Sequence, residues 1–355
     1  MWIENDIFKE DMEFIANASY IPWDRLKHKA ILVTGATGLI GFNLVSALLY
    51  VSLHKDIPLR VLALVRSEEK AKERFHEALQ AGAPLDFIVG DLDHIPAIEE
   101  HIDYVIHGGS PTASRYFAEH PVETITSNLH GALSLLELAK RNQAEGFLFL
   151  SSMEVYGGIH QHEVVDETHA SFVNTMVPRS SYPEVKRMIE SLCACYAAEY
   201  HVPAKVIRLT QTFGAGVRKD DNRVFAQFAR SAMNHENIVM FTRGGTEHMY
   251  LYTADAVTAI LAVLLLGKNG EAYNAANEQA YCSIKEMAET VADLPLIREQ
   301  FNGPVSVVID ESKNDGKLYP PELYMQLDTN KLQQLGWKAH TDLTGMFTRM
   351  ILLME

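Results

Sequence analysis

One short segment restricts the possible folds of this chain more than any other feature. The residues Thr34-Gly-Ala-Thr-Gly-Leu-Ile-Gly41 follow a short apolar run and precede a stretch with helical periodicity. Gly35 permits the backbone angles of a tight turn, Gly38 lets the main chain approach a pyrophosphate, and Gly41 lets the helix pack close to the strand. The helix N-terminus then offers unpaired N–H groups to phosphate oxygens. We therefore expect a dinucleotide to contact this turn through Gly35, Thr37, Gly38, Leu39, Ile40 and Gly41.

Short apolar runs alternate with amphipathic stretches on both sides of this turn. Continuous apolar strands separated by helices are typical of a parallel sheet that is buried on both faces. With right-handed crossovers, the pattern predicts an α/β fold with a Rossmann-type doubly wound parallel sheet. The expected strands are 30–34, 59–65, 85–89, 104–107, 146–150 and 204–209, and the expected helices are 39–53, 67–81, 121–141 and 180–200.

The alternation loosens after the first half of the chain, which suggests three regions. Residues 1–28 precede the first strand and are expected to form a helical arm. Residues 29–210 form the dinucleotide-binding domain with the catalytic residues, and residues 211–355 form mainly a smaller substrate lobe, interleaved with the first domain. Long loops rich in Gly, Pro, His and Asp in the second half favour a functional role for that lobe.

Composition excludes several classes of protein. The 46 acidic residues outnumber the 31 lysines and arginines, giving a net charge of −15, so nucleic acid is not an expected partner. The three cysteines have no metal-site spacing and are expected to be buried thiols in a reducing cytoplasm, with no metal bound. No signal-peptide pattern is present, and the most apolar run, Ala259–Leu266, is far shorter than the ~20 residues that span a bilayer.

Residues at the ends of the next strands bear on the choice of cofactor. An acidic residue usually selects NAD at the end of the second strand, but Arg66 is the residue near that position. Arg66 could pair with a 2′-phosphate, which favours NADP, or stack on the adenine of either cofactor. Asp91 is placed to accept from the adenine amino group. Further expected cofactor contacts are Leu92, Gly108, Gly109 and Ser110, so NAD is expected and NADP stays possible.

A Tyr-x-x-x-Lys pattern supplies a base for hydride chemistry. Tyr182 and Lys186 are four residues apart and therefore lie on one face of a helix. An ammonium beside the phenol, with a positive nicotinamide nearby, is expected to lower the pKa of Tyr182 towards the working pH. Ser152 follows the expected strand 146–150 at its carboxyl end, where it can hydrogen-bond the reacting oxygen.

Three motifs together carry a family resemblance. The segments TGATGLIG, SSMEVYG and SYPEVK, in this order, resemble the extended short-chain dehydrogenase/reductase family of NAD-dependent nucleotide-sugar epimerases and dehydratases. Within it, the pattern is closest to UDP-glucuronate decarboxylases. The resemblance implies that Ser152 is the catalytic Ser/Thr, Tyr182 the base, Lys186 its partner, and Arg223 an arginine that binds the nucleotide or diphosphate.

Several positions depart from the family pattern. Sugar dehydratases carry an Asp-Glu pair after the Ser/Thr, whereas this chain has Met153-Glu154, so the acid is missing while Glu154 could still act as a C5 base. The arginine of the decarboxylases aligns with His248, which is shorter and only fractionally charged at neutral pH. The implied substrate-binding residues are Ser110, Thr112, Ser152, Met153, Gln211, Arg223 and His248.

These observations predict an enzyme that acts on a nucleotide sugar, with a UDP-sugar as the expected substrate, through a transient 4-keto intermediate. Epimerisation is favoured, because both the dehydratase acid and the decarboxylase arginine are absent. The alternatives are decarboxylation or dehydration, an NADP-dependent carbonyl reductase, and a non-catalytic NAD(P)-binding regulator. The resemblance also implies a homodimer formed by the helices near 121–141 and 180–200.

Overall fold

The computed structural model describes residues 5–110, 114–301, 303–313 and 322–354. Its main sheet has seven strands in the order β11-β7-β5-β4-β1-β2-β3, and each neighbouring pair is parallel. The order reverses beside β1, which is the doubly wound arrangement expected from the sequence. The strands are β1 (Ala30–Thr34), β2 (Arg60–Val65), β3 (Leu85–Val89), β4 (Tyr104–His107), β5 (Gly146–Ser152), β7 (Ala204–Leu209) and β11 (Ala272–Ala275).

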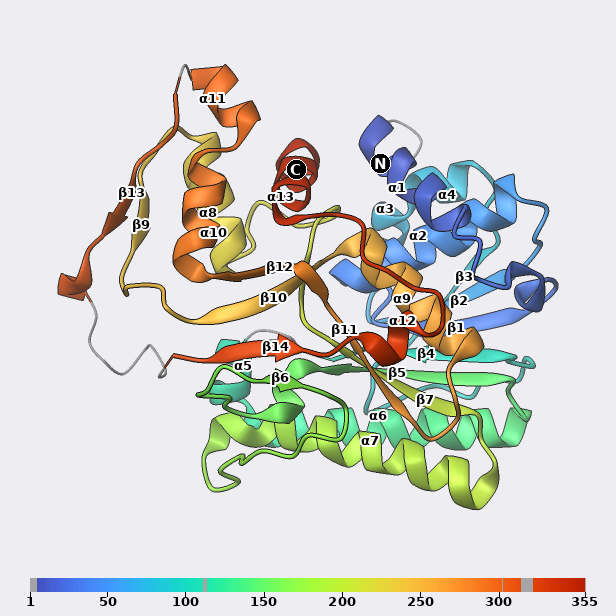
Figure 1. Ribbon diagram of the computed structural model, residues 1–355. Helices are drawn as coiled ribbons and strands as arrows, with labels where there is room; N and C mark the ends of the chain where they lie inside the picture. The colour runs from blue at the N-terminus through green and yellow to red at the C-terminus, as the bar shows by residue number, and fades with distance from the viewer. Residues whose placement is uncertain (1–4, 111–113, 302, 314–321, 355) are drawn as a thin grey trace.

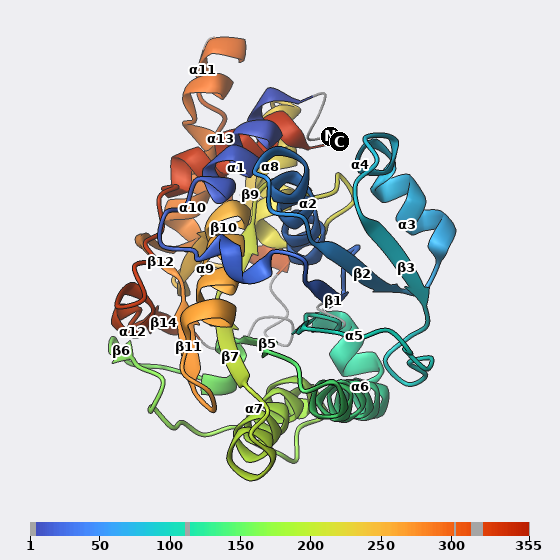
Figure 2. The ribbon, with the colours of Figure 1, turned by 90° about the vertical axis from the view of Figure 1, so that its right-hand side faces the viewer.

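Helices cover both faces of this sheet (Figure 1, Figure 2). One face carries α6 (Pro121–Asn142) and α7 (Ser181–Tyr200), which lie side by side. The other face carries α2 (Leu39–His54), α3 (Glu68–Arg74), α4 (His76–Gln80) and α9 (Thr253–Leu266). Because it is sandwiched between the sheet, α9 and the N-terminal helix, α2 is buried continuously from Gly41 to Val51.

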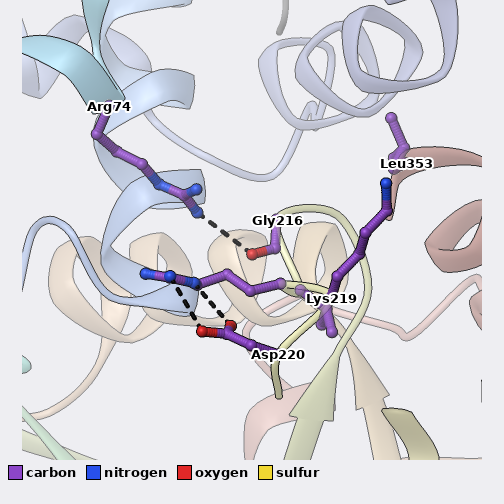
Figure 3. Close-up of a pocket in the computed structure, with 7 residues that line it drawn as sticks. Arg74, Gly216, Lys219, Asp220 and Leu353 are labelled. Carbon is purple, nitrogen blue, oxygen red and sulfur yellow. Dashed lines mark hydrogen bonds and ion pairs between the residues drawn. The ribbon is translucent and has the colours of Figure 1, made fainter. Parts of the chain in front are cut away.

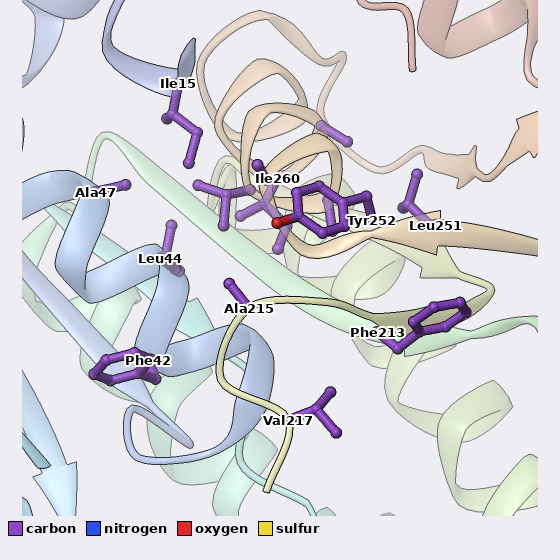
Figure 4. Packing of buried hydrophobic residues seen from close by; sticks show 14 of the residues in the cluster. Ile15, Phe42, Leu44, Ala47, Phe213, Ala215, Val217, Leu251, Tyr252 and Ile260 are labelled. Carbon is purple, nitrogen blue, oxygen red and sulfur yellow. The ribbon is translucent and has the colours of Figure 1, made fainter. Parts of the chain in front are cut away.

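The N-terminal segment is a helical arm laid on the body. It consists of α1 (Asp6–Ala16) and the 3-10 turn η1 (Trp23–Leu26). Ile15 of α1 points toward Leu44 and Ala47 of α2 and toward Ile260 of α9, and all four side chains are fully buried (Figure 4). The arm therefore closes the core on the outer side of α2.

A second, smaller mixed sheet and its helices lie beside the main sheet. Its strand order is β12-β10-β14-β6, with β8 also paired to β10. Its strands are β6 (Val164–Val165), β8 (Gln211–Phe213), β10 (Glu247–Tyr252), β12 (Asn277–Ser283) and β14 (Tyr324–Leu327), and β9 (Ile238–Met240) pairs with β13 (Val307–Ile309). The remaining helical elements are α5 (Ser114–Glu119), η2 (Met153–Tyr156), η3 (Pro178–Ser180), α8 (Val224–Met233), α10 (Ile284–Ala292), α11 (Pro295–Phe301), η4 (Glu311–Lys313), α12 (Asn330–Gln333) and α13 (Leu343–Leu353).

The two sheets exchange chain segments in both directions. Strand β11 comes from the second half of the chain and joins the main sheet, whereas β6 comes from the first half and joins the smaller one. A domain boundary at residue 210 stays a prediction. The expectation of buried thiols is wrong for Cys195, which is exposed on α7, while Cys193 and Cys282 are buried; all three are free.

Candidate active site

The glycine turn between β1 and α2 has the geometry of a phosphate cradle. Gly35 has a φ of +72°, and a Cβ there would lie 2.6 Å from the Gly108 carbonyl oxygen. A Cβ on Gly41 would lie 2.1 Å from the Gly35 carbonyl oxygen, so the first turn of α2 sits directly against the turn. Gly38 is the N-cap of α2 and places no side chain over its first N–H groups. The first N–H groups of α2 thus have room for phosphate oxygens, and the cradle fits a dinucleotide.

The loop after β4 forms the other side of this cleft. Gly108 and Gly109 follow β4, which is paired to β1. The Thr34 hydroxyl accepts the N–H of Gly109 at 3.0 Å and hydrogen-bonds Nδ1 of His107 at 2.8 Å. A Cβ on Gly108 would lie 2.8 Å from the Leu150 side chain. The structure therefore brings the two expected cofactor segments together. Ser110 ends this described segment, and Thr112 lies outside the described residues.

The residues expected at the adenine end are less specific. Arg66 follows β2 and is exposed. One carboxylate oxygen of Asp91 accepts the N–H groups of Asp93 and His94 at 3.0 and 2.8 Å, so it caps its own loop. Leu92 packs against α6, where a Cβ on Gly131 would lie 2.9 Å from it. Roles of Arg66 and Asp91 toward a cofactor stay predictions.

The expected catalytic residues converge where β5 meets α7. Tyr182 and Lys186 lie one turn apart in α7, and the Ser152 side chain at the end of β5 hydrogen-bonds the Tyr182 hydroxyl. Oγ of Ser152 also accepts the N–H of Glu154 at 3.2 Å. Nζ of Lys186 donates to the Leu150 carbonyl oxygen at 2.9 Å and lies 5.5 Å from the centre of the Tyr182 ring. One cluster at the carboxyl end of the sheet therefore contains Ser152, Glu154, Tyr182 and Lys186.

The charge states in this cluster differ from the expectation. Burial and the Glu154 carboxylate raise the pKa of Tyr182 above its ordinary value, although Ser152 and Arg179 oppose the shift. Burial also lowers the pKa of Lys186 to about 8, partly countered by Glu190 and Glu154. The expectation that Lys186 lowers the pKa of Tyr182 is therefore wrong for the protein without a bound cofactor. The reason is that packing removes both groups from water and the Lys186 ammonium is bonded to a carbonyl oxygen.

Two residues of this cluster were missed in the sequence. Arg179 in η3 places Nη2 at 2.8 and 3.1 Å from the two carboxylate oxygens of Glu154. Phe117 of α5 stacks on the Tyr182 ring at 4.2 Å between centroids, and the Arg179 guanidinium lies 4.9 Å from the centre of Phe117. An arginine three residues before Tyr182, on the turn into the same helix, is the signal that could have found Arg179. Phe117 carries no comparable signal.

The expected substrate residues are not all brought together. Met153 is buried beside Met249, in the small cluster under η2. His248 lies on the opposite face of β10 from Met249, edge-on to Tyr250. Burial lowers the pKa of His248 to about 4, so this ring is neutral at neutral pH rather than fractionally charged, and it cannot hold an anion by charge.

The remaining expected substrate residues are more accessible. Gln211 begins β8 and is exposed. Arg223 is the N-cap of α8, pairs with Asp221 at 2.6 Å, and lies over the ring of Phe225 at 4.7 Å. Among the described residues, no group of three or more His, Cys, Asp or Glu could hold a metal ion. No helix in the described part of the chain is long and apolar enough to cross a membrane.

Comparison with known families identifies the chain. A model of the NAD dependent epimerase/dehydratase family matches residues 31–276, which include the glycine turn and the Ser152–Tyr182–Lys186 cluster. The chain belongs to the NAD dependent epimerase/dehydratase family. The family resemblance read from the motifs is thereby confirmed, and NAD is the cofactor typical of this family.

Relatives of this epimerase/dehydratase chain carry one recurring name. The chain is 26% identical over 295 residues to UDP-glucuronic acid decarboxylase 1 of Danio rerio. This alignment covers 83% of the chain and 66% of the relative. The chain is 29% identical over 315 residues to UDP-glucuronic acid decarboxylase 6 of Arabidopsis thaliana, covering 88% and 85%. The chain spans only 60% of the matching enzyme of Xenopus tropicalis and 66% of that of Danio rerio.

Solved structures confirm the Rossmann-type fold. An epimerase from Methanothermobacter thermautotrophicus superposes with a TM-score of 0.74 at 21% identity, covering 93% of each chain. UDP-glucose 4-epimerase of Thermotoga maritima superposes with a TM-score of 0.73 at 19% identity, covering 91% of this chain and 98% of that enzyme.

Proposed function

We propose that this chain is an NAD-dependent enzyme that oxidises a hydroxyl of a UDP-sugar transiently and returns the sugar as its epimer. The observation that carries the proposal is the cluster of Ser152, Tyr182 and Lys186 at the carboxyl end of β5, on the same sheet edge as the glycine turn. Open α/β sheets bind their ligands at this edge. A cofactor that accepts hydride and a base for the hydroxyl proton can therefore face the same sugar carbon.

Each side chain has one role in this scheme. Tyr182 removes the proton of the C4 hydroxyl, and Ser152 holds the C4 oxygen next to the phenol. The glycine turn Gly35–Gly41 would hold NAD, which would supply a reversible hydride acceptor, so the reaction would need no other redox partner. Lys186, when protonated, favours the phenolate of Tyr182 through its positive charge.

The fate of the 4-keto sugar depends on the groups around C5. The C4 carbonyl acidifies the C5 proton, and Glu154 is a carboxylate of the cluster, where Nη2 of Arg179 donates to both of its oxygens. Met153 offers no acid to protonate a leaving hydroxyl, so dehydration is disfavoured. His248 is neutral and faces away from Met153, so it is a poor receptor for a sugar carboxylate. Epimerisation is the outcome that needs neither group.

Decarboxylation is the second candidate, and two observations favour it. The relatives named above are UDP-glucuronic acid decarboxylases. The Arg179 guanidinium also already binds a carboxylate, that of Glu154, beside Tyr182. If Arg179 exchanged Glu154 for the carboxylate of a uronic acid, the 4-keto intermediate could lose CO₂.

A panel experiment in D₂O separates these outcomes. The protein is incubated with UDP-, dTDP-, GDP- and CDP-sugars, including a uronic acid, and the products are analysed by mass and NMR. An epimer supports the proposal: deuterium at C5 shows that the C5 proton exchanges, as expected for Glu154 as base, and an epimer without deuterium shows inversion at C4 by hydride return. Loss of CO₂ from the uronic acid establishes the second candidate. Stoichiometric oxidation of NADPH with small carbonyls would instead show a reductase, and no turnover with retained NAD binding would show a regulator.

The tyrosine role has its own test. Tyr182→Phe is expected to abolish turnover, because Tyr182 is the proposed base for the hydroxyl proton, while NAD affinity stays within about twofold of wild type. A variant with full activity refutes the role of Tyr182.

Mass analysis of nucleotide released from the denatured protein decides the cofactor: recovery of NAD alone rejects a 2′-phosphate contact of Arg66.

We further propose a homodimer in the cytoplasm. The two long helices α6 and α7 share the outer face of the sheet, and apolar side chains stand exposed there: Val122 at 66%, Ile125 at 41% and Met188 at 55%. Exposed apolar side chains on both helices suit a two-fold four-helix contact. Sedimentation should give about twice the 39.8 kDa of one chain. Val122→Glu with Met188→Glu should give the single chain, and Val239→Glu on β9 is the control; a wild-type monomer contradicts the proposal.

A further inference from the structure

A second pocket lies apart from the cluster around Tyr182. It has a volume of about 280 Å³ and lies between α3, the loop from β8 to α8, and the C-terminal helix α13 (Figure 3). Its lining residues are Arg74, Gly216, Val217, Arg218, Lys219, Asp220 and Leu353. None of these residues belongs to the expected cofactor, catalytic or substrate sets.

One of its three cations is fixed in place. The Arg74 guanidinium lies over the ring of Phe42 at 4.1 Å, and Nη2 donates to the Gly216 carbonyl oxygen at 3.2 Å. Gly216 has a φ of +87°, and a Cβ there would lie 3.3 Å from Nη2 of Arg74. A glycine thus makes the room for the guanidinium, and the ring fixes its plane before any ligand arrives.

The other two cations come from consecutive residues of the loop. Nε and Nη2 of Arg218 bind the two carboxylate oxygens of Asp220 at 3.0 and 3.2 Å. This pair is exposed at 74% and 73%, so it is weak, and a phosphate with more charge can take the same fork. The Lys219 side chain extends toward Leu353 in Figure 3. Among the described residues that line the pocket, three cations face one carboxylate, on a chain whose net charge is −15.

We propose that this pocket binds a phosphate-bearing small molecule at a site separate from those of the dinucleotide and the nucleotide sugar. Arginine forks and a lysine are the donors that proteins use for phosphate oxygens. The volume of about 280 Å³ is at the lower end of small-molecule sites, so it suits a phosphate with one compact group. Val217 and Leu353 provide the apolar wall for that group.

The pocket is connected to the substrate side of the molecule. Asp221, next to Asp220, accepts the N–H of Arg223 at 2.9 Å and its guanidinium at 2.6 Å. Arg230 of α8 donates to the Lys219 carbonyl oxygen at 2.8 Å, so the loop is tied to α8. A phosphate that draws Arg218 from Asp220 therefore shifts the loop that positions Arg223. The effect of this shift on the enzyme rests on the proposed function, whereas binding of the phosphate in the pocket does not.

Isothermal titration of the full-length protein with inorganic pyrophosphate, in a phosphate-free buffer, tests the site. Wild type should bind saturably at one site. Arg218→Gln with Lys219→Gln should weaken binding about tenfold or more, since two charged donors are lost. The matched control, Arg243→Gln with Lys285→Gln, removes the same charge from an exposed surface elsewhere and should leave the affinity within about twofold.

Two further titrations locate the bound pyrophosphate. Binding should persist with saturating NAD and in Arg223→Gln, because neither touches the pocket. The proposal is overturned if NAD or Arg223→Gln abolishes the binding, which would place pyrophosphate in the cofactor or substrate site. It is also overturned if the matched control weakens binding as much as the pocket variant, or if pyrophosphate does not bind. None of these results depends on turnover, so they are independent of the proposed function.

Discussion

Replacing Lys186 by methionine should stabilise the protein at neutral pH while it removes activity. Lys186 is almost completely buried, and burial lowers its pKa from 10.5 to about 8. This difference corresponds to about 3 kcal/mol of unfavourable free energy in the folded chain when the lysine is protonated. Loss of the hydrogen bond to the Leu150 carbonyl oxygen removes about 1–2 kcal/mol. The net gain for Lys186→Met is therefore about 1–2 kcal/mol at pH 7.

The sign of the effect depends on pH in a defined way. The folded-state pKa is lower than the unfolded one, so folding disfavours the proton. The cost is fully present below about pH 8 and fades between pH 8 and 10.5, where both states become neutral. Above that range only the lost hydrogen bond remains, so Lys186→Met should then be the less stable protein. Urea denaturation of both proteins from pH 7 to 10.5 measures the difference.

Lys205 in β7 offers a matched control. Burial lowers the pKa of Lys205 to about 8 as well, and its Nζ donates to the Pro203 carbonyl oxygen at 3.1 Å. Lys205→Met should show the same pH-dependent gain in stability and keep its turnover, because Lys205 is outside the proposed active site. A Lys186→Met protein that is less stable than wild type at pH 7, or whose gain does not change with pH, refutes the reasoning.

Two other predictions concern backbone space and a buried charge. Gly41→Ala places a Cβ 2.1 Å from the Gly35 carbonyl oxygen, so the turn must shift. NAD titration should show lost binding, and denaturation should show that the free energy of unfolding falls by about 2 kcal/mol or more. Unchanged NAD binding contradicts the close packing. Arg349→Met removes the cation that pairs with the buried Asp11 carboxylate at 2.8 Å and leaves its hydrogen bond from the Tyr252 hydroxyl; burial already raises the pKa of Asp11 to about 6. The free energy of unfolding of the variant should fall by about 3 kcal/mol at pH 7 and by less at pH 5, because Asp11 takes up a proton there. An equal fall at both pH values is evidence against the unpaired Asp11 charge as the cause.

Local apolar patterns predicted the main sheet well. Strands β1, β3, β4 and β7 begin and end as the sequence indicated, because strands buried on both faces are continuous apolar runs. The helix expected over 67–81 is divided into α3 and α4 at Phe75, whose ring is buried 5.4 Å from that of Phe42. Packing against a distant aromatic residue overrides helical periodicity there. The smaller sheet was not predicted, since β6 and β8 have only two and three residues and β14 pairs with β6 from the other half of the chain.

The sequence also predicted that Ser152, Tyr182 and Lys186 lie together in the candidate active site, but not which of them carry protons. Spacing along one helix is enough to bring Tyr182 and Lys186 together. Their protonation depends on Phe117, on Glu154 and on the depth of burial, all set by elements far apart in the sequence. Burial moves the two pKa values in opposite directions, so the lysine is the stronger acid of the pair. Lys186 is therefore expected to give a limb near pH 8 in a measured rate profile, and Tyr182 needs additional positive charge at the site to lose its proton in the same range.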